Sequence, residues 1–437
     1  KAAATLLQQQ QPSSWCRWMS VAVTTAAETF PQGPVLTSLN EHFHPTQDHF
    51  TLRDMLRDYV AHEVEPQAAH YNKTETFNID LFRGLGTDDD GLGLLGLTVP
   101  ETYGGVGLDA AAVVLVHEEL SYSDPAFCLS YLAHSLLLVN NLNVNASHEQ
   151  KQRFLPALCQ GSKIGGMAMS EPAAGTDVLG MQTTATPVDD QDAWKLNGRK
   201  MWITNGTLDG QTTGDVFLVY ARTGPGRSDI SQFIVEKGMP GFTLGQQIKD
   251  KLGMRASMTA ELVFEDVLVP ADNLVGPPNQ ATLCMMRNLE IERLGLAAMA
   301  TGIARRCLDD MKGYAGERKA FGKDLYSFGQ MQQHLAESYA AYMAGRSYVY
   351  ATAKALDLQS HGNGLDADGC KLFCAPMAKQ TADRAIQMMG GYGYVGEYTV
   401  ERLWRDAKLL EIGGGTNESH HKNMARDLKK MGDNKLP

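Results

Sequence analysis

Hydrophobic residues recur every three to four positions through the first third of the chain. The pattern begins at Leu52, Met55, Leu56 and Tyr59, and this spacing places apolar side chains along one face of a helix. Further helices are predicted at 80–85, 110–120 and 148–158. Residues 40–162 are therefore expected to form an all-helical domain.

Shorter apolar runs of the kind found in strands take over in the middle third. They lie at 194–196, 201–204, 216–221, 232–235 and 261–264. Asn197-Gly198, between the first two runs, favours a tight hairpin, because both residues tolerate the positive φ that such a turn needs. Residues 163–275 are predicted to form a β domain.

Long helical patterns return in the last third, at 289–311, 331–356 and 372–389. Each is long enough to pack in a helix bundle, so residues 276–437 are expected to form a second helical domain. The order of helices, strands and helices along the chain predicts an α+β protein.

The composition fits a globular protein and argues against two kinds of interaction. Hydrophobic residues make up 43% of the chain, charged residues 20%, and the net charge is −11. This negative charge, without a basic and aromatic stripe, argues against nucleic-acid binding. No uninterrupted apolar run is long enough to cross a membrane, so no transmembrane helix is expected.

The seven cysteines are odd in number and scattered, which is typical of reduced thiols in an intracellular compartment. Cys370 and Cys374 lie one helical turn apart, but no second close pair accompanies them. We expect both to be buried as small hydrophobic residues, and we expect no metal site.

The beginning of the chain differs from the rest. Residues 1–27 carry Lys1 and Arg17 among many Ser, Thr, Ala and Gln residues, with no acid before Glu28. This composition resembles a transit peptide and predicts a protein of the mitochondrial matrix. The alternative is a tail without a targeting role, and on either interpretation residues 1–35 lie outside the folded domains.

A polar loop carries the first sign of chemistry. In Ala168–Asp177 a proline and a glycine interrupt regular structure, while Ser170 and Thr176 offer hydroxyl groups to a ligand. Trp202, a short way on, can lay its flat ring against another flat ring. On composition alone this stretch is an ordinary loop.

Together, Ala168–Asp177 and Trp202–Asn205 resemble the acyl-CoA dehydrogenase family at almost every position. Further matching motifs follow in the family's order at 252–255, 263–267, 318–322, 390–394, 405–408 and 411–417. The resemblance implies an N-terminal helical domain, a central β-barrel-like domain and a C-terminal four-helix bundle. It also implies FAD between the β domain and the bundle, and a homotetramer.

Within the family the likeness is strongest to the branch that oxidises isovaleryl-CoA, at 129–135 and 233–242. The implied reaction is α,β-dehydrogenation of a short branched acyl-CoA in leucine breakdown, with electrons passed to electron-transferring flavoprotein. A carboxylate removes the α-proton while hydrogen bonds hold the thioester oxygen. The alternatives are another acyl chain length, an oxidase that reduces oxygen, or a non-catalytic assembly subunit that keeps the fold.

Most family members carry the catalytic glutamate at the position of Gly414, which cannot act as a base. In the branch that this chain resembles, the glutamate lies at the start of the C-terminal domain, and Glu292 matches it. Glu290 is the rival on the same helix, but positions two apart differ by about 200° in direction, so both cannot face the flavin. The alternative for Glu292 is an ion pair on a solvated face.

The resemblance also assigns the other site residues. The flavin-binding matches are Met167, Ala168, Met169, Ser170, Thr176, Trp202, Ile203, Thr204, Arg318, Gln330, Gln387, Met388, Met389, Gly390, Gly391, Thr416, Asn417 and Glu418. Of these, Arg318 and 387–391 match groups that reach the FAD of a neighbouring subunit, and Gln330 lies one residue beyond the position of a family glutamine.

Substrate-lining matches come from the β-domain loop, the N-terminal helices, the helical run 289–294 and the C-terminal motif. They are Thr176, Leu129, Ala133, Glu290, Arg293, Gly413, Gly414 and Gly415. Gly413 takes the place of a bulky aromatic residue in straight-chain relatives, so the resemblance implies room for a branched acyl group.

Overall fold

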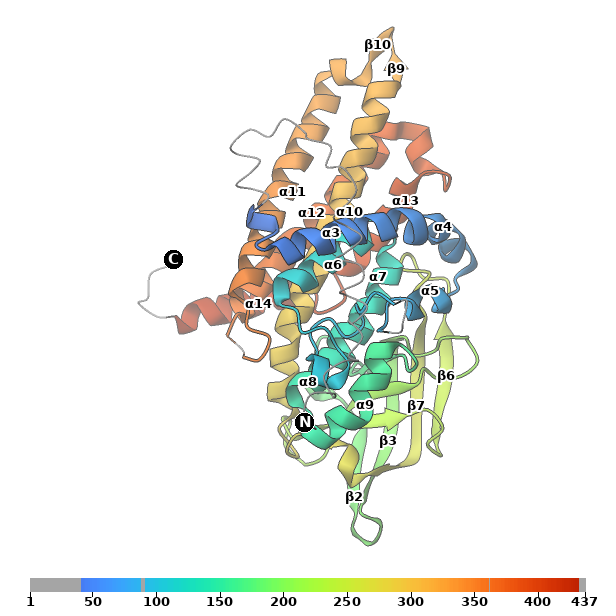
Figure 1. Cartoon of the computed structure of the whole chain (residues 1–437), viewed down its shortest axis with the longest axis vertical. Helices are drawn as coiled ribbons and strands as arrows, with labels where there is room; N and C mark the ends of the chain where they lie inside the picture. Colours follow the sequence, from blue (N-terminus) through green and yellow to red (C-terminus); the bar gives the residue numbers. More distant parts are fainter. Residues whose placement is uncertain (1–40, 88–90, 361, 432–437) are drawn as a thin grey trace, which may run out of the picture.

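The computed structural model describes residues 41–87, 91–360 and 362–431. Helices occupy the first and the last parts of the described residues, and a sheet lies between them in the sequence (Figure 1). The predicted α+β organisation is confirmed. The predicted transit peptide at 1–35 lies outside the described residues.

The N-terminal helices pack against the long helices of the C-terminal part. Their bounds are α3 Gln47–Tyr59, a π-helical turn Val60–Val64, α4 Glu65–Thr74, α5 Ile79–Arg83, α6 Ala110–Ser123, α7 Pro125–Leu132, a π-helical segment Ala133–Asn140, α8 Asn141–Asn145 and α9 His148–Gln160. Ser147 and Gln150 form a reciprocal capping box that sets the start of α9. The buried helix α6 packs along α10 (Ala281–Glu317), so the two helical parts share one hydrophobic core.

One helical stretch, Pro125–Asn145, is long and apolar enough by composition to cross a membrane. In the fold, 83% of its most apolar window is buried inside the molecule. Its side chains, Phe127 and Leu136 among them, belong to the hydrophobic core. The stretch therefore packs as a core helix of the N-terminal domain.

The middle domain is an eight-stranded sheet with the order β6-β7-β3-β2-β4-β5-β8, and β1 pairs with β4. The strands are β1 Gly165–Ala168, β2 Thr184–Val188, β3 Ala193–Thr204, β4 Val216–Arg222, β5 Ile230–Glu236, β6 Phe242–Ile248, β7 Thr259–Pro270 and β8 Leu274–Val275. Because β1 runs parallel to β4 in the sheet, it anchors the start of the polar loop that follows it.

The hairpin predicted at Asn197-Gly198 is wrong. Both residues lie inside the single strand β3, where the register against β7 shifts between Leu196 and Gly198. Gly198 has a φ of 149°, and an added Cβ would lie 2.5 Å from Thr183 Oγ1. The glycine therefore marks a β-bulge where another residue approaches the backbone closely.

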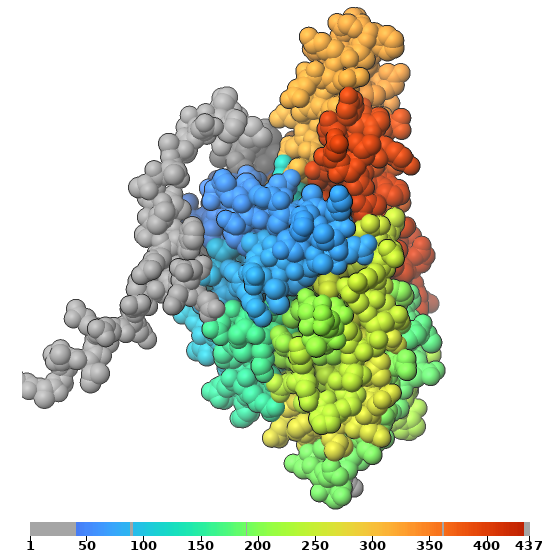
Figure 2. Space-filling view, turned by 90° about the vertical axis from the view of Figure 1, so that its right-hand side faces the viewer, coloured from blue at the N-terminus to red at the C-terminus, as the bar shows by residue number. Residues whose placement is uncertain are grey.

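The C-terminal bundle consists of α10, α11 (Gly329–Ala355), α12 (Gly364–Met389) and α13 (Thr399–Leu410), and α14 (Asn417–Lys430) follows it. Figures 1 and 2 show that α10 and α11 extend beyond the rest as an arm, tipped by strands β9 (Lys319–Ala320) and β10 (Lys323–Asp324). On α12, Cys370 and Cys374 are fully buried, as predicted.

The matched motifs at 252–255 and 405–408 meet where the β domain touches the bundle. An added Cβ on Gly253 would lie 2.4 Å from the carbonyl of Arg405, so only a glycine permits this approach. The N–H of Met254 donates to the buried carboxylate of Asp406 at 2.5 Å. This contact fixes the sheet relative to α13, and with it the two sides of the candidate site.

Candidate active site

Glu292 lies on the inward face of α10 and is buried. None of the described residues hydrogen-bonds to its Oε2 atom, although that atom is shielded from solvent. Burial raises the pKa of Glu292 to about 7, against the opposing effect of the Arg293 and Lys371 cations. A carboxylate on a solvated face would have neither property, so the surface ion pair considered as an alternative is wrong.

The C-terminal glycine motif covers this carboxylate directly. Gly414 has a φ of 65°, and an added Cβ would lie 3.3 Å from Glu292 Oε1 and 2.2 Å from Leu296 Cδ1. Gly415 also has a positive φ, of 100°. These contacts require glycine at 414, and they bring together two segments more than a hundred residues apart in the sequence.

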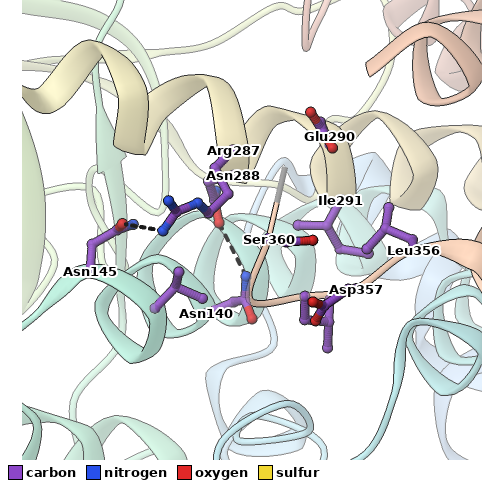
Figure 3. A pocket seen from close by; sticks show the side chains of 11 residues that line it. Asn140, Asn145, Arg287, Asn288, Glu290, Ile291, Leu356, Asp357 and Ser360 are labelled. Carbon is purple, nitrogen blue, oxygen red and sulfur yellow. Dashed lines mark hydrogen bonds between the residues drawn. The ribbon is translucent and has the colours of Figure 1, made fainter. Parts of the chain in front are cut away.

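Glu290, which the family match implies to line the substrate site, is bound to the protein backbone in this structure. Its carboxylate accepts the N–H groups of Gly362 and Asn363 at 3.0 to 3.3 Å, directly before α12. Figure 3 shows it beside a small pocket lined by Asn140, Asn288 and Ser360, among others. That pocket, of about 10 Å³, holds at most one water molecule, so the structure assigns Glu290 to anchoring the chain between α11 and α12.

Arg293 is also committed to a protein partner. Its guanidinium group pairs with Asp368 of α12 at 3.0 Å, and Asp368 in turn accepts from His420 Nδ1 of α14 at 2.6 Å. The Nε atom of Arg293 is buried, and no hydrogen-bond partner for it is found among the described residues. Arg293 therefore lies beside Glu292 with one donor group still available.

The polar loop after β1 is held by a buried ion pair that the sequence interpretation missed. Lys200 of β3 is fully buried, and its Nζ donates to Glu171 Oε1 at 2.8 Å and to the Met169 carbonyl at 3.0 Å. The Glu171 carboxylate also accepts the N–H groups of Gln182 and Thr183. The strand also carries Lys195, Asn197 and Arg199, so the sequence did not single out Lys200 as the lysine that is buried and therefore needs a partner.

Trp202 presents its ring to the outside of the sheet. It has a φ of 66°, in the left-handed region, and 61% of its surface is exposed. For a bulky residue this conformation is a strained one that the surroundings must enforce. Asn205 supplies part of that restraint, because its Nδ2 donates to the carbonyls of Ser130 and Gly165 at 2.9 and 3.0 Å.

The other predicted flavin positions on the β domain lie on β1, on the loop that follows it, and next to Trp202 at the end of β3. Met167 and Ala168 end β1, Met169 and Ser170 open the loop, and Ile203 and Thr204 end β3. Ala168, Met169 and Ile203 are buried, Met167, Ser170 and Thr204 are half-buried, and Thr176 is exposed. The backbone of the loop and the ring of Trp202 thus form the accessible part.

The N-terminal helices connect the loop side of the site to the helix that carries the base. An added Cβ on Gly166 would lie 3.9 Å from Ala133 Cβ, and one on Gly295 would lie 3.0 Å from Leu136 Cδ1. Ala133 is buried and Leu129 is half-buried. Ala133 therefore adjoins β1, while the same helical segment packs on α10 one turn beyond Glu292.

A second, larger cavity lies on the arm. It has a volume of about 630 Å³ and is lined by residues that include Tyr314, Arg318, Met388, Met389, Gly390, Gly391 and Tyr392. The guanidinium carbon of Arg318 lies 5.8 Å from the centre of the Tyr392 ring. An added Cβ on Gly390 or Gly391 would meet nothing within 4 Å, so the backbone here is open to a ligand.

The remaining predicted positions are near these two regions without lining the cavity. Gln387 and Gln330 are exposed, at the end of α12 and the start of α11. Thr416 caps α14 by accepting the N–H of Ser419, so Asn417 and Glu418 form its first turn. Gly413 is half-buried, beside the glycines that cover Glu292.

These features suit FAD in both chemistry and shape. An exposed aromatic ring and an open loop backbone can hold a flat ring system. The arm cavity offers an arginine and an unobstructed glycine backbone, which suit phosphate groups. Trp202 and Ser170 would hold the flavin ring, and Arg318 with 388–391 would hold the phosphate end of a flavin from a neighbouring copy.

Comparison with protein families matches three successive stretches of the chain to acyl-CoA dehydrogenase models. The N-terminal domain model covers residues 46–162, the middle domain model 166–267 and the C-terminal domain model 282–429. The chain belongs to the acyl-CoA dehydrogenase family. It is accordingly an FAD-dependent oxidoreductase, and the family fold expected from the motifs is confirmed.

Individual family members resemble the chain over most of its length. It is 40% identical to isovaleryl-CoA dehydrogenase, mitochondrial, of Solanum tuberosum, over 89% of this chain and 92% of that protein. It is 38% identical to 2-methylacyl-CoA dehydrogenase, mitochondrial, of the same plant, over 95% and 98%. A solved acyl-CoA dehydrogenase from Bacillus anthracis, complexed with FAD, matches with a TM-score of 0.82 at 30% identity, over 88% and 67%.

Proposed function

We propose that this protein catalyses the α,β-dehydrogenation of isovaleryl-CoA to 3-methylcrotonyl-CoA. The observation that carries the proposal is the state of Glu292, a buried carboxylate with a raised pKa and one unpaired oxygen, under the glycine motif of the family. A base whose pKa lies near 7 can hold a proton in one half of the reaction and release it afterwards.

The reaction needs the chain to remove one proton and to exclude water. Glu292 takes the α-proton of the thioester, and the electron pair left behind forms the α,β double bond. Bound FAD would supply the acceptor for the hydride that leaves the β-carbon. Burial keeps water away from Glu292, and the buried carboxylate is a stronger base there than in solvent.

The small residues around the base support a short, branched acyl group. Gly413 and Ala133 add little volume, and Leu129 is the larger wall residue among the proposed lining positions. Likeness to the isovaleryl-CoA dehydrogenase of Solanum tuberosum supports the same substrate. The 2-methylacyl-CoA dehydrogenase of that plant, at 38% identity over 95% of this chain, favours a second candidate, an acyl-CoA branched at the α-carbon.

The wider role follows from the same proposal. Electrons would pass to electron-transferring flavoprotein, and the protein would act in leucine breakdown in the mitochondrial matrix. The mitochondrial names of the plant relatives support this location. The open cavity on the arm supports a homotetramer in which each copy completes the flavin site of its neighbour.

Anaerobic bleaching of the bound flavin tests the proposal. Isovaleryl-CoA should bleach the flavin completely within the first turnover, and 2-methylbutyryl-CoA, butyryl-CoA and palmitoyl-CoA should do so more slowly. Faster bleaching by the 2-methyl substrate would favour the second candidate. Protein that purifies without FAD would instead favour a non-catalytic subunit, and rapid peroxide formation in air would favour an oxidase.

A further inference from the structure

A buried chain of polar groups lies directly behind the glycine motif. Lys371 of α12 donates to the Gly415 carbonyl at 2.6 Å and contacts His420 Nε2 at 3.1 Å. His420 Nδ1 in turn lies 2.6 Å from Asp368. Because Nδ1 faces a carboxylate, its proton belongs there, which leaves Nε2 to accept from the lysine. Lys371 and His420 have no exposed surface.

The same lysine borders the proposed base. An added Cβ on Gly414 would lie 3.5 Å from Lys371 Cε and 3.3 Å from Glu292 Oε1. The lysine stem and the carboxylate therefore flank the same small volume under the loop. Nothing in the proposed reaction uses Lys371, and a lysine that is fully buried needs a reason to be there, because desolvating its charge is costly.

We propose that Lys371 is a positioning residue for the base: its ammonium group holds the Gly413–Gly415 loop over Glu292 and favours the ionised form of that carboxylate. The inference rests on the proposed function, since it concerns the group that takes the proton. It gives the lysine two separable roles, a hydrogen bond to the loop and a positive charge beside the base.

Other charged groups face this lysine from every element around it. Glu292 and Arg293 lie on α10, Asp368 on α12, Glu411 at the end of α13, and His420 on α14. Burial lowers the pKa of Lys371 to about 8, while the nearby carboxylates act in the opposite direction. The lysine is therefore mostly charged at pH 7, where Glu292 is close to half ionised.

Removal of this charge should make Glu292 harder to ionise. Lys371→Gln keeps a donor for the Gly415 carbonyl but loses the charge, and Lys371→Met loses both. In each variant the acidic limb of the kcat/KM profile should move to higher pH by about one unit, because a nearby opposite charge lowers a carboxyl pKa by one unit or more. Lys371→Arg keeps the charge, so its acidic limb should lie within about 0.3 pH units of that of the natural protein.

The matched control is Lys379→Met on the same helix. Lys379 pairs with Glu411 at 3.2 Å and lies about two helical turns from Lys371, so its loss should leave the acidic limb of the kcat/KM profile in place.

A second readout does not depend on turnover. The infrared band of the protonated Glu292 carboxyl, identified by its absence in Glu292→Gln, should titrate at higher pH in Lys371→Gln than in the natural protein.

The outcomes separate this inference from the proposed function. If the natural protein bleaches with an acyl-CoA but Lys371→Gln leaves both the limb and the infrared titration unchanged, only the role of Lys371 is overturned. An equal shift in Lys371→Arg and Lys371→Gln would also overturn it, because charge would not be the cause. If the Gln and Met variants do not fold, an unchanged limb for Lys371→Arg supports the proposal, and a shifted limb contradicts it.

Discussion

Two glutamates, two positions apart on α10, have opposite surroundings. Glu292 has an unpaired oxygen in a buried volume, whereas Glu290 accepts backbone N–H groups before α12. The difference follows from helix geometry, because residues two apart point in nearly opposite directions. Only one of these carboxylates is free to take a proton from a substrate.

We expect Glu292→Gln to reduce turnover at least a thousandfold, on the order of the upper range for loss of a general base, while FAD stays bound. Steady-state assays and the flavin spectrum of the purified variant check this. The matched variant Glu290→Gln should keep turnover within about threefold and lower the melting temperature, because the N–H groups of Gly362 and Asn363 lose a charged acceptor. Equal loss of turnover in both variants would contradict the division of roles.

The pH dependence of the natural protein has a definite sign. Since Glu292 acts in its ionised form and burial raises its pKa to about 7, kcat/KM should fall about tenfold for each unit below that value. A profile that stays flat down to pH 5 would show that the base titrates at the ordinary carboxyl pKa. Such a profile would contradict the proposal that a buried Glu292 with a raised pKa is the base.

At the scale of elements, the polar loop after β1 depends on one strand lysine. Lys200 ties the Met169 carbonyl and Glu171 together, and Glu171 holds the backbone at 182–183 in turn. The loop is thus fixed to the sheet at both of its ends. The buried ion pair adds to the apolar packing of Met169 and Met181, which belong to a hydrophobic core cluster.

We expect Lys200→Met to lower FAD affinity at least tenfold and to destabilise the protein by about 3 kcal/mol, because a buried carboxylate loses its charged partner. Flavin retained after dialysis and thermal unfolding give the two readouts. The control is Lys195→Met on the same strand, whose partner Asp266 lies 3.9 Å away on the surface. Loss of flavin in both variants would point to general damage of the strand.

The sequence pattern and the family motifs account for much of this arrangement, for identifiable reasons. Periodicity marks α10–α12 because their apolar faces pack over many turns, and the motif match marks Glu292. Lys200, Lys371 and His420 escaped notice because their roles depend on contacts 29 to 49 residues away in the chain. Asn197-Gly198 misled because a bulge and a turn favour the same residues.

At the scale of the whole molecule, the proposed flavin contacts fall into two separate regions. One lies between the β domain and the bundle, and the other lies at the base of the arm's tip, where the end of α10 adjoins the end of α12. One chain carries each region once. We propose, as the family resemblance implies, that a copy binding flavin between its own domains uses the arm of another copy.

We expect Arg318→Ala to lower flavin occupancy severalfold without changing the oligomeric state, because a bidentate phosphate contact is lost. Native mass spectrometry measures both quantities in one experiment. The neighbouring Lys319→Ala, also exposed but not part of the cavity lining, is the control and should keep full occupancy. Full occupancy in Arg318→Ala would exclude this arginine from the flavin site.

Arg318 follows the end of α10, the same long helix that carries Glu292, and this separation of the two groups has a genetic consequence. A chain defective at Glu292 can still lend an intact arm, and a chain defective at Arg318 still has an intact base. In a cell that makes both defective chains, some mixed assemblies would pair the good arm with the good base and recover part of the activity. If the arm serves another copy, two inherited defects that each lower the activity alone would then partly complement each other when they occur together.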